Sequence, residues 1–165
     1  MRFDVADMNA TNEELLDTIL HEMLHVVGVG TLWQERGLTV GYDTPSVAYI
    51  GLGGVAGCLT TGASCQTGVP VENTGGPGQR NGHWRDAVFG VELMTAYSSP
   101  AINPFSVMTA RSLADLGFTV NLAAADPFTI TGSGLRENQV PGRRSQVGVA
   151  WETPLGFGPY FFPAK

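Results

Sequence analysis

Residues 11–30 read TNEELLDTILHEMLHVVGVG, and this stretch decides the fold because it holds a complete helix with its start and end signals. Thr11 and Glu14 have the spacing of a capping box, in which each side chain accepts from the backbone of the other residue. Gly28 and Gly30 predict a left-handed turn that ends the helix. Between these signals, apolar residues recur at helical spacing, which predicts an amphipathic helix. These residues are Leu15, Leu16, Ile19, Leu20, Met23, Leu24 and Val27.

His21-Glu22-Met23-Leu24-His25 lies in the middle of this predicted helix and forms an H-E-x-x-H motif. The spacing puts both imidazoles on one helix face, where each offers a ring nitrogen to one Zn²⁺ ion. Glu22 suits a general base for a zinc-bound water, whose pKa the metal lowers to about 7. Such a pair also arises by chance on helix surfaces. Histidines and a glutamate on so apolar a helix nevertheless need partners.

A catalytic zinc takes three protein ligands and keeps one position open. The chain has 3 histidines, so His83 is the remaining candidate for the third ligand. The alternative for His83 is a surface histidine beside Trp84.

In combination these motifs resemble the metzincin zinc peptidases. The run from His21 to Gly28 is similar to the start of the metzincin zinc signature. The short form of that signature has its third His where this chain has Thr31. The leishmanolysin-like family, in contrast, inserts a long segment before the third His, and residues 26–82 fit that insertion ahead of His83-Trp84. The chain therefore resembles a bacterial-type member of that family.

Two further segments strengthen the resemblance. Glu92-Leu93-Met94-Thr95 follows His83 at the place where the family has its Met-turn. The run Pro70-Val71-Glu72-Asn73-Thr74-Gly75-Gly76 resembles the segment ahead of the third His in that family. The resemblance covers most of residues 2–128.

The resemblance implies a role for each residue of the motifs. Glu22 would be the general base, Met94 the apolar floor under the metal, and Gly28 the point where the chain turns toward the third ligand. An ordinary core methionine is the alternative for Met94. The implied zinc ligands are His21, His25 and His83.

Other polar residues near the motifs have weaker assignments. Tyr97 is a candidate for contact with zinc or substrate, and a packed tyrosine is its alternative. Arg85, Asp86 and Glu92 are candidates for orienting His83 from behind, as partners of metal-bound histidines do.

The expected fold class is α+β with a metzincin-like zincin core. It would have a long active-site helix, a second helix after the Met-turn, long irregular loops and little sheet. Residues 2–6 read as the last strand of the twisted sheet that metzincins carry, so the resemblance implies the C-terminal part of such a domain. We expect a single domain, residues 1–165, made of 1–30 (last strand and zinc helix), 31–82 (insertion), 83–126 (third ligand, Met-turn and helix) and 127–165 (C-terminal segment).

The long insertion is expected to be mostly irregular. Residues 42–50 predict a short helix or strand, and residues 51–82, rich in Gly, Thr, Pro and Asn, predict loops. Residues 51–56 match the G-x-G-x-x-A form of a dinucleotide fingerprint, but that fingerprint must open a helix. Residues 57–68 are poor helix material, which argues against nucleotide binding.

The second helix is expected after the Met-turn. Asn103-Pro104 reads as its N-cap and first-turn proline, and Gly117 as its end. Residues 127–165 predict short strands and turns.

Cys58 and Cys65 would either close a small loop through a disulfide or remain two thiols. A disulfide favours an oxidising compartment, and the expected location is secreted or extracellular. The net charge of −6 and the pI of about 4.9 argue against nucleic-acid binding. The chain also lacks a run of about 20 apolar residues for a membrane span.

The expected function is zinc-dependent hydrolysis of peptide bonds in proteins or peptides by one catalytic Zn²⁺ ion. The alternative is a zinc-stabilised, non-catalytic binding module or an inactive fragment of a metzincin. A secreted scaffold whose motifs arose by chance is the third possibility.

Overall fold

The computed structural model describes residues 11–99 and 103–130. Helix α1 spans Asn12–Val26, and the predicted capping box between Thr11 and Glu14 is confirmed. Its predicted end is confirmed as well, since Gly28 and Gly30 follow with φ angles of 112° and 77°. The strand expected over residues 2–6 and most of the segment 127–165 lie outside the described residues.

Gly30 brings the chain after α1 against the segment that leads to His83. A Cβ atom on Gly30 would run into the carbonyl group of Gly82. The close approach of these two backbones therefore needs glycine at position 30.

Three short antiparallel strands form a small sheet in the order β1-β2-β3. Single bridges then pair Val71 with Trp84, and Trp84 with Thr95. The sheet thereby continues into the segment that carries His83. The strands are β1 (Thr39–Val40), β2 (Ala48–Tyr49) and β3 (Val69–Pro70).

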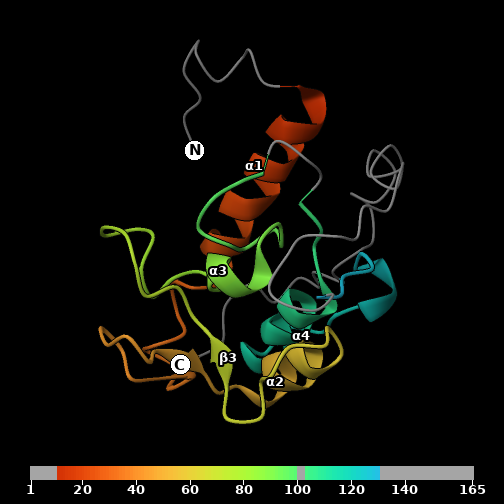
Figure 1. Ribbon diagram of the computed structural model, residues 1–165. Helices are drawn as coiled ribbons and strands as arrows, with labels where there is room; N and C mark the ends of the chain where they lie inside the picture. The colour runs from red at the N-terminus through yellow and green to blue at the C-terminus, as the bar shows by residue number, and fades with distance from the viewer. Residues whose placement is uncertain (1–10, 100–102, 131–165) are drawn as a thin grey trace, which may run out of the picture.

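Helices and sheet together make the described part an α+β fold. The other helices are α2 (Leu52–Leu59), α3 (Asp86–Phe89), α4 (Val107–Asp115) and the short 3-10 helix η2 (Leu122–Ala124). In Figure 1, α1 (red) projects at one end, while α2 and α4 pack side by side at the other.

Helix α2 lies inside residues 51–82, so the prediction of loops was wrong there. The helix forms because a distant carboxylate caps it. The backbone N–H groups of Gly53 and Gly54 donate to the two oxygens of Asp115, at 2.8 and 2.9 Å. Tyr49 donates its hydroxyl proton to the same carboxylate. These contacts come from elements far away in the chain, so local sequence does not reveal them.

The same helix changes the argument about the dinucleotide fingerprint. The glycines of residues 51–56 do open a helix, but it ends at Leu59, so the expectation that residues 57–68 are not helical was wrong only for residues 57–59. Asp115, however, occupies the helix N-terminus where a phosphate would bind.

Gly57 lets α2 and α4 approach each other closely. A Cβ atom at this position would lie 2.6 Å from Cα of Met108. We expect Gly57→Ala to destabilise the fold by about 1–3 kcal/mol through overpacking, despite the better helix propensity of alanine. Urea unfolding measures the loss. Gly76→Ala is the control, because a Cβ at Gly76 meets nothing within 4 Å. Equal stability of the two variants would contradict this packing.

Helix α4 starts later than predicted. Its N-cap is Ser106, whose hydroxyl accepts from the backbone of Thr109, and not Asn103. Pro104 lies outside the helix, because its carbonyl accepts a hydrogen bond from the backbone N–H of Leu93. Gly117 has a φ angle of 99° just after the helix, which confirms the predicted end.

The core centres on three buried aromatic side chains. The ring centroids of Trp33, Tyr49 and Trp84 lie 4.4–5.3 Å apart. Trp84 directly follows His83, so the core fixes the backbone next to that histidine.

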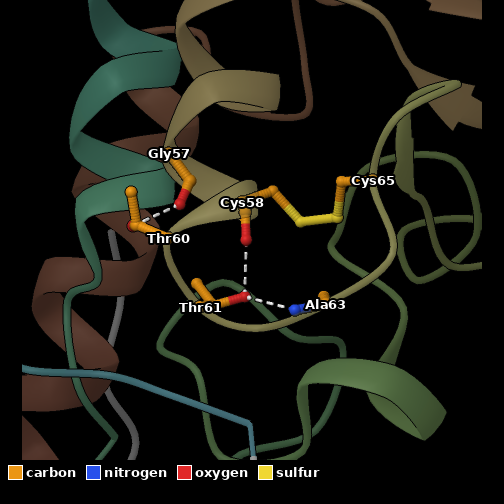
Figure 2. The surroundings of a disulfide bond; sticks show 6 residues. All are labelled: Gly57, Cys58, Thr60, Thr61, Ala63 and Cys65. Atoms are coloured by element: carbon orange, nitrogen blue, oxygen red, sulfur yellow. Dashed lines mark hydrogen bonds between the residues drawn. A yellow bond between two sulfur atoms is a disulfide. The ribbon is translucent and has the colours of Figure 1, made fainter.

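A disulfide joins Cys58 and Cys65, as one of the two expected alternatives had it. Both cysteines are fully buried, and the bond ties the end of α2 to the loop before β3 (Figure 2). The hydroxyl of Thr61 donates to the Cys58 carbonyl and accepts from the backbone of Ala63.

Within residues 11–99 and 103–130, every helix is too short or too polar to cross a bilayer.

Candidate metal centre

Three histidines from two parts of the chain meet at one point. His21 and His25 project from α1, and His83 comes from the segment after β3. Their Nε2 atoms form a triangle with sides of 2.9, 3.0 and 3.1 Å. His83 is buried, and the other two are half-buried. The structure thus brings together the three residues that the sequence predicted as metal ligands.

A backbone carbonyl fixes the other nitrogen of each ring. The Nδ1 atoms of His21, His25 and His83 lie 2.7, 2.8 and 2.8 Å from the carbonyl oxygens of Leu93, Val29 and Gln79. A carbonyl oxygen only accepts, so each Nδ1 carries the proton and donates. In a neutral imidazole the Nε2 atom then holds a lone pair. The three lone pairs meet inside the triangle.

This arrangement fits a divalent metal ion. Lone pairs about 3 Å apart with no proton between them repel each other, and a cation turns that repulsion into binding. Four ligands about 2.0–2.1 Å from a tetrahedral zinc are about 3.3 Å apart, close to the observed triangle. Neutral imidazole suits Zn²⁺, Cu²⁺ and Ni²⁺. The donor set therefore fits zinc and keeps one side open.

Burial favours the neutral form of His21 and of His83. It lowers the pKa of His21 and takes the pKa of His83 from 6.5 to about 4. The carbonyl of Leu93 opposes this shift at His21, and that of Gln79 opposes it at His83. Neutral rings are the form that binds metal.

We expect the metal-free chain to lose stability in acid. Its folded-state His83 has a pKa of about 4 against 6.5 when unfolded, so the unfolded chain takes up the proton first. Neutral His83 therefore costs the folded chain no stability above pH 6.5, and the free energy of unfolding decreases as the pH falls toward about 4. Urea midpoints of chelator-treated protein at pH 7 and pH 5 measure the change. A midpoint that stays constant or rises on acidification would contradict it.

Glu22 lies beside the histidines at the wall of a cavity. Its side chain is exposed, and the cavity measures about 180 Å³. Carboxylates, hydroxyls and amides make up much of the wall. The lining residues are Asp17, Thr18, His21, Glu22, Leu93, Thr95, Ala96, Ser98 and Asn103. A carboxylate and an imidazole thus share one small, largely polar space.

Met94 is fully buried in a turn that pairs with the His83 segment. The backbone N–H of Thr95 donates to the carbonyl of Glu92, and that of Trp84 donates to the carbonyl of Met94 at 2.9 Å.

Tyr97 is 49% exposed, so it is not a packed core tyrosine.

The residues expected to orient His83 do not contact its ring nitrogens. The partner of His83 Nδ1 is the carbonyl of Gln79. Arg85 instead donates to the carbonyls of Val71 and Pro45. The backbone N–H of Asp86 donates to Glu72. Every residue has a backbone carbonyl, so the residue types in the sequence could not identify the partner of His83.

Glu72 was missed as an organiser of the His83 segment. Its carboxylate accepts from the backbones of Asn73, Thr74 and Asp86. Its own backbone N–H donates to the carbonyl of His83 at 2.8 Å. Burial raises the pKa of Glu72, but the hydrogen bonds outweigh it and lower that pKa overall. The carboxylate therefore holds both ends of the loop from residue 72 to residue 86.

Comparison with protein-family models, with curated proteins and with solved structures finds no match to this chain.

Proposed function

We propose that this protein is a zinc metalloendopeptidase resembling the leishmanolysin-like metzincins. One observation carries the proposal. Three histidines direct unprotonated Nε2 atoms at one point beside an exposed glutamate, in the H-E-x-x-H order of His21, Glu22 and His25.

Zinc is the metal we propose for this site. Three histidine ligands with an open fourth position are a donor set of catalytic zinc. Thiolate ligands are not available, because both cysteines of the chain form the disulfide. Zinc, when bound, supplies a Lewis acid that polarises the substrate carbonyl and acidifies a water molecule.

Glu22 would act as the general base and then as the general acid. It takes a proton from the attacking water as the C–O bond forms, and delivers a proton to the amine as the C–N bond breaks. Its exposed position on the cavity wall leaves it accessible to both groups. The Nδ1–H···O=C bonds hold the three imidazoles in place and need no rearrangement during this transfer.

The proposal extends to the fold and to the surroundings of the protein. In it, α1 is the active-site helix, residues 92–95 are the Met-turn, and α4 is the helix that follows it. Proteins or peptides would be the substrates, with one side chain entering the cavity beside His21 and Glu22. The buried disulfide supports secretion into an oxidising medium.

Cleavage of an unfolded protein tests the proposal. Zinc-loaded chain is incubated with casein, then treated with a chelator, then resupplied with zinc. We expect cleavage that stops on metal removal and returns with zinc. A chain that binds one zinc per molecule but cleaves neither casein nor peptides would contradict peptidase activity and favour a zinc-stabilised binding module.

A further inference from the structure

Glu92 is a fully buried carboxylate between the metal centre and the N-terminus of α4. Its Oε2 atom accepts from the backbone N–H of Met94 at 2.6 Å. Its Oε1 atom accepts from the Ser106 hydroxyl at 2.5 Å and from the Ser106 backbone at 3.2 Å. The hydroxyl of Thr109 donates to the same oxygen. Glu92 therefore joins the turn of residues 92–95 to α4.

The direction of each hydrogen bond is fixed. Thr109 Oγ1 accepts from the indole N–H of Trp84 at 2.8 Å, so its own proton points to Glu92. Ser106 Oγ accepts from the backbone of Thr109 at 3.3 Å, so its proton also points to Glu92. Burial raises the pKa of Glu92 overall, and these hydrogen-bond donors oppose that shift. Both oxygens of Glu92 thus act as acceptors.

One peptide group links Glu92 to His21. The N–H of Met94, which donates to Glu92, belongs to the same planar unit as the carbonyl of Leu93. That carbonyl accepts from Nδ1 of His21 at 2.7 Å. Holding the N–H side of this plane fixes the direction of its carbonyl. A hydrogen bond at one end also polarises the group and strengthens the bond at the other end.

We propose that Glu92 is a positioning residue for the metal centre, which fixes the ring and tautomer of His21 through the peptide between Leu93 and Met94. The consequence for zinc affinity rests on the proposed function. The consequence for the tautomer of His21 does not, because it holds in the metal-free chain.

Glu92→Gln tests this role with almost no change in shape. An amide has one acceptor oxygen, so its NH2 group must face either the N–H of Met94 or that of Ser106. We expect nuclear magnetic resonance of the metal-free variant to show a mixture of His21 tautomers, where the wild type has Nδ1–H alone. We expect zinc affinity, measured by competition with a coloured chelator, to fall by about 10–100-fold.

Ser112→Ala is the matched control. Ser112 is buried on α4, like Thr109, and its hydroxyl donates to the carbonyl of Thr109 instead of to Glu92. We expect Ser112→Ala to lower the stability of the fold without changing the His21 tautomer or the zinc affinity. If Glu92→Gln keeps the Nδ1–H tautomer and binds zinc like Ser112→Ala, Glu92 has no positioning role.

Thr109→Val is the second variant, for the case in which Glu92→Gln does not fold. It removes one donor to Glu92, and we expect the same two changes at smaller size. Agreement of Thr109→Val with Ser112→Ala in both measurements would overturn the proposal. If the wild type binds no zinc, the proposed function fails, while the tautomer result still decides the role of Glu92.

Discussion

Glu22→Ala is expected to lower the rate of zinc-dependent peptide hydrolysis by about 10²–10⁴-fold, the usual contribution of a general acid–base group. The variant should bind zinc nearly as tightly as the wild type, because the ring nitrogens of the three histidines pair with one another and with backbone carbonyls and not with Glu22. Its side chain is exposed, so its removal leaves the packing unchanged. Casein cleavage measures the rate, and chelator competition measures the affinity.

Two controls make this experiment specific. Glu22→Gln keeps the shape of the side chain but cannot take a proton, so it should lose as much activity as Glu22→Ala. Glu13→Ala removes an exposed acid from the first turn of the same helix and should remain active. Unchanged hydrolysis in Glu22→Ala would rule out the proposed mechanism.

His83→Ala is expected to lower zinc affinity by at least about 100-fold, the upper end of what loss of a mere hydrogen-bond partner of a ligand costs. The variant keeps His21 and His25 on α1 but loses the third corner of the Nε2 triangle, and with it two of the three sides. Zinc at 100 times its dissociation constant stabilises a folded protein by about 2.7 kcal/mol. The wild type should therefore melt at a lower temperature after chelation, and the variant should respond far less.

Gln79→Ala is the matched control for His83→Ala. Gln79 contacts His83 through its backbone carbonyl, which alanine also supplies. Its side-chain oxygen accepts from the backbone N–H of Gly76 and not from His83. Zinc affinity close to that of the wild type is expected. If His83→Ala binds zinc as tightly as Gln79→Ala, His83 is not a ligand.

Local signals in the sequence predicted α1 and its histidine pair correctly. The capping box at Thr11 and Glu14 and the glycines after Val26 define a helix by themselves. His83 could be predicted as well, because the chain has only 3 histidines and a set of three histidine ligands must include it. The structure brings these three residues together without any sequence signal for the 2.9–3.1 Å distances.

Tertiary contacts explain what the sequence did not predict. A run of glycines becomes α2 because Asp115 caps it and because Gly57 fits against Met108. Helix α4 begins after Ser106 and not at Pro104, because the carbonyl of Pro104 accepts a hydrogen bond from the backbone N–H of Leu93.

The partners of the histidines were equally hidden. They are backbone carbonyls, and any residue type supplies a carbonyl. Glu92 was considered as a partner of His83. Its contacts instead lead through one peptide group to His21, which only three-dimensional geometry reveals.

X-ray absorption at the zinc edge of the zinc-loaded chain tests the central claim most directly, because it counts the atoms around the metal. We predict one zinc per chain, with three imidazole nitrogens about 2.0–2.1 Å away and one further oxygen ligand. The multiple-scattering signal of imidazole should be weaker in His83→Ala than in the wild type. Zinc surrounded by oxygen alone, or zinc bound without fixed stoichiometry, would contradict a metal centre built from His21, His25 and His83.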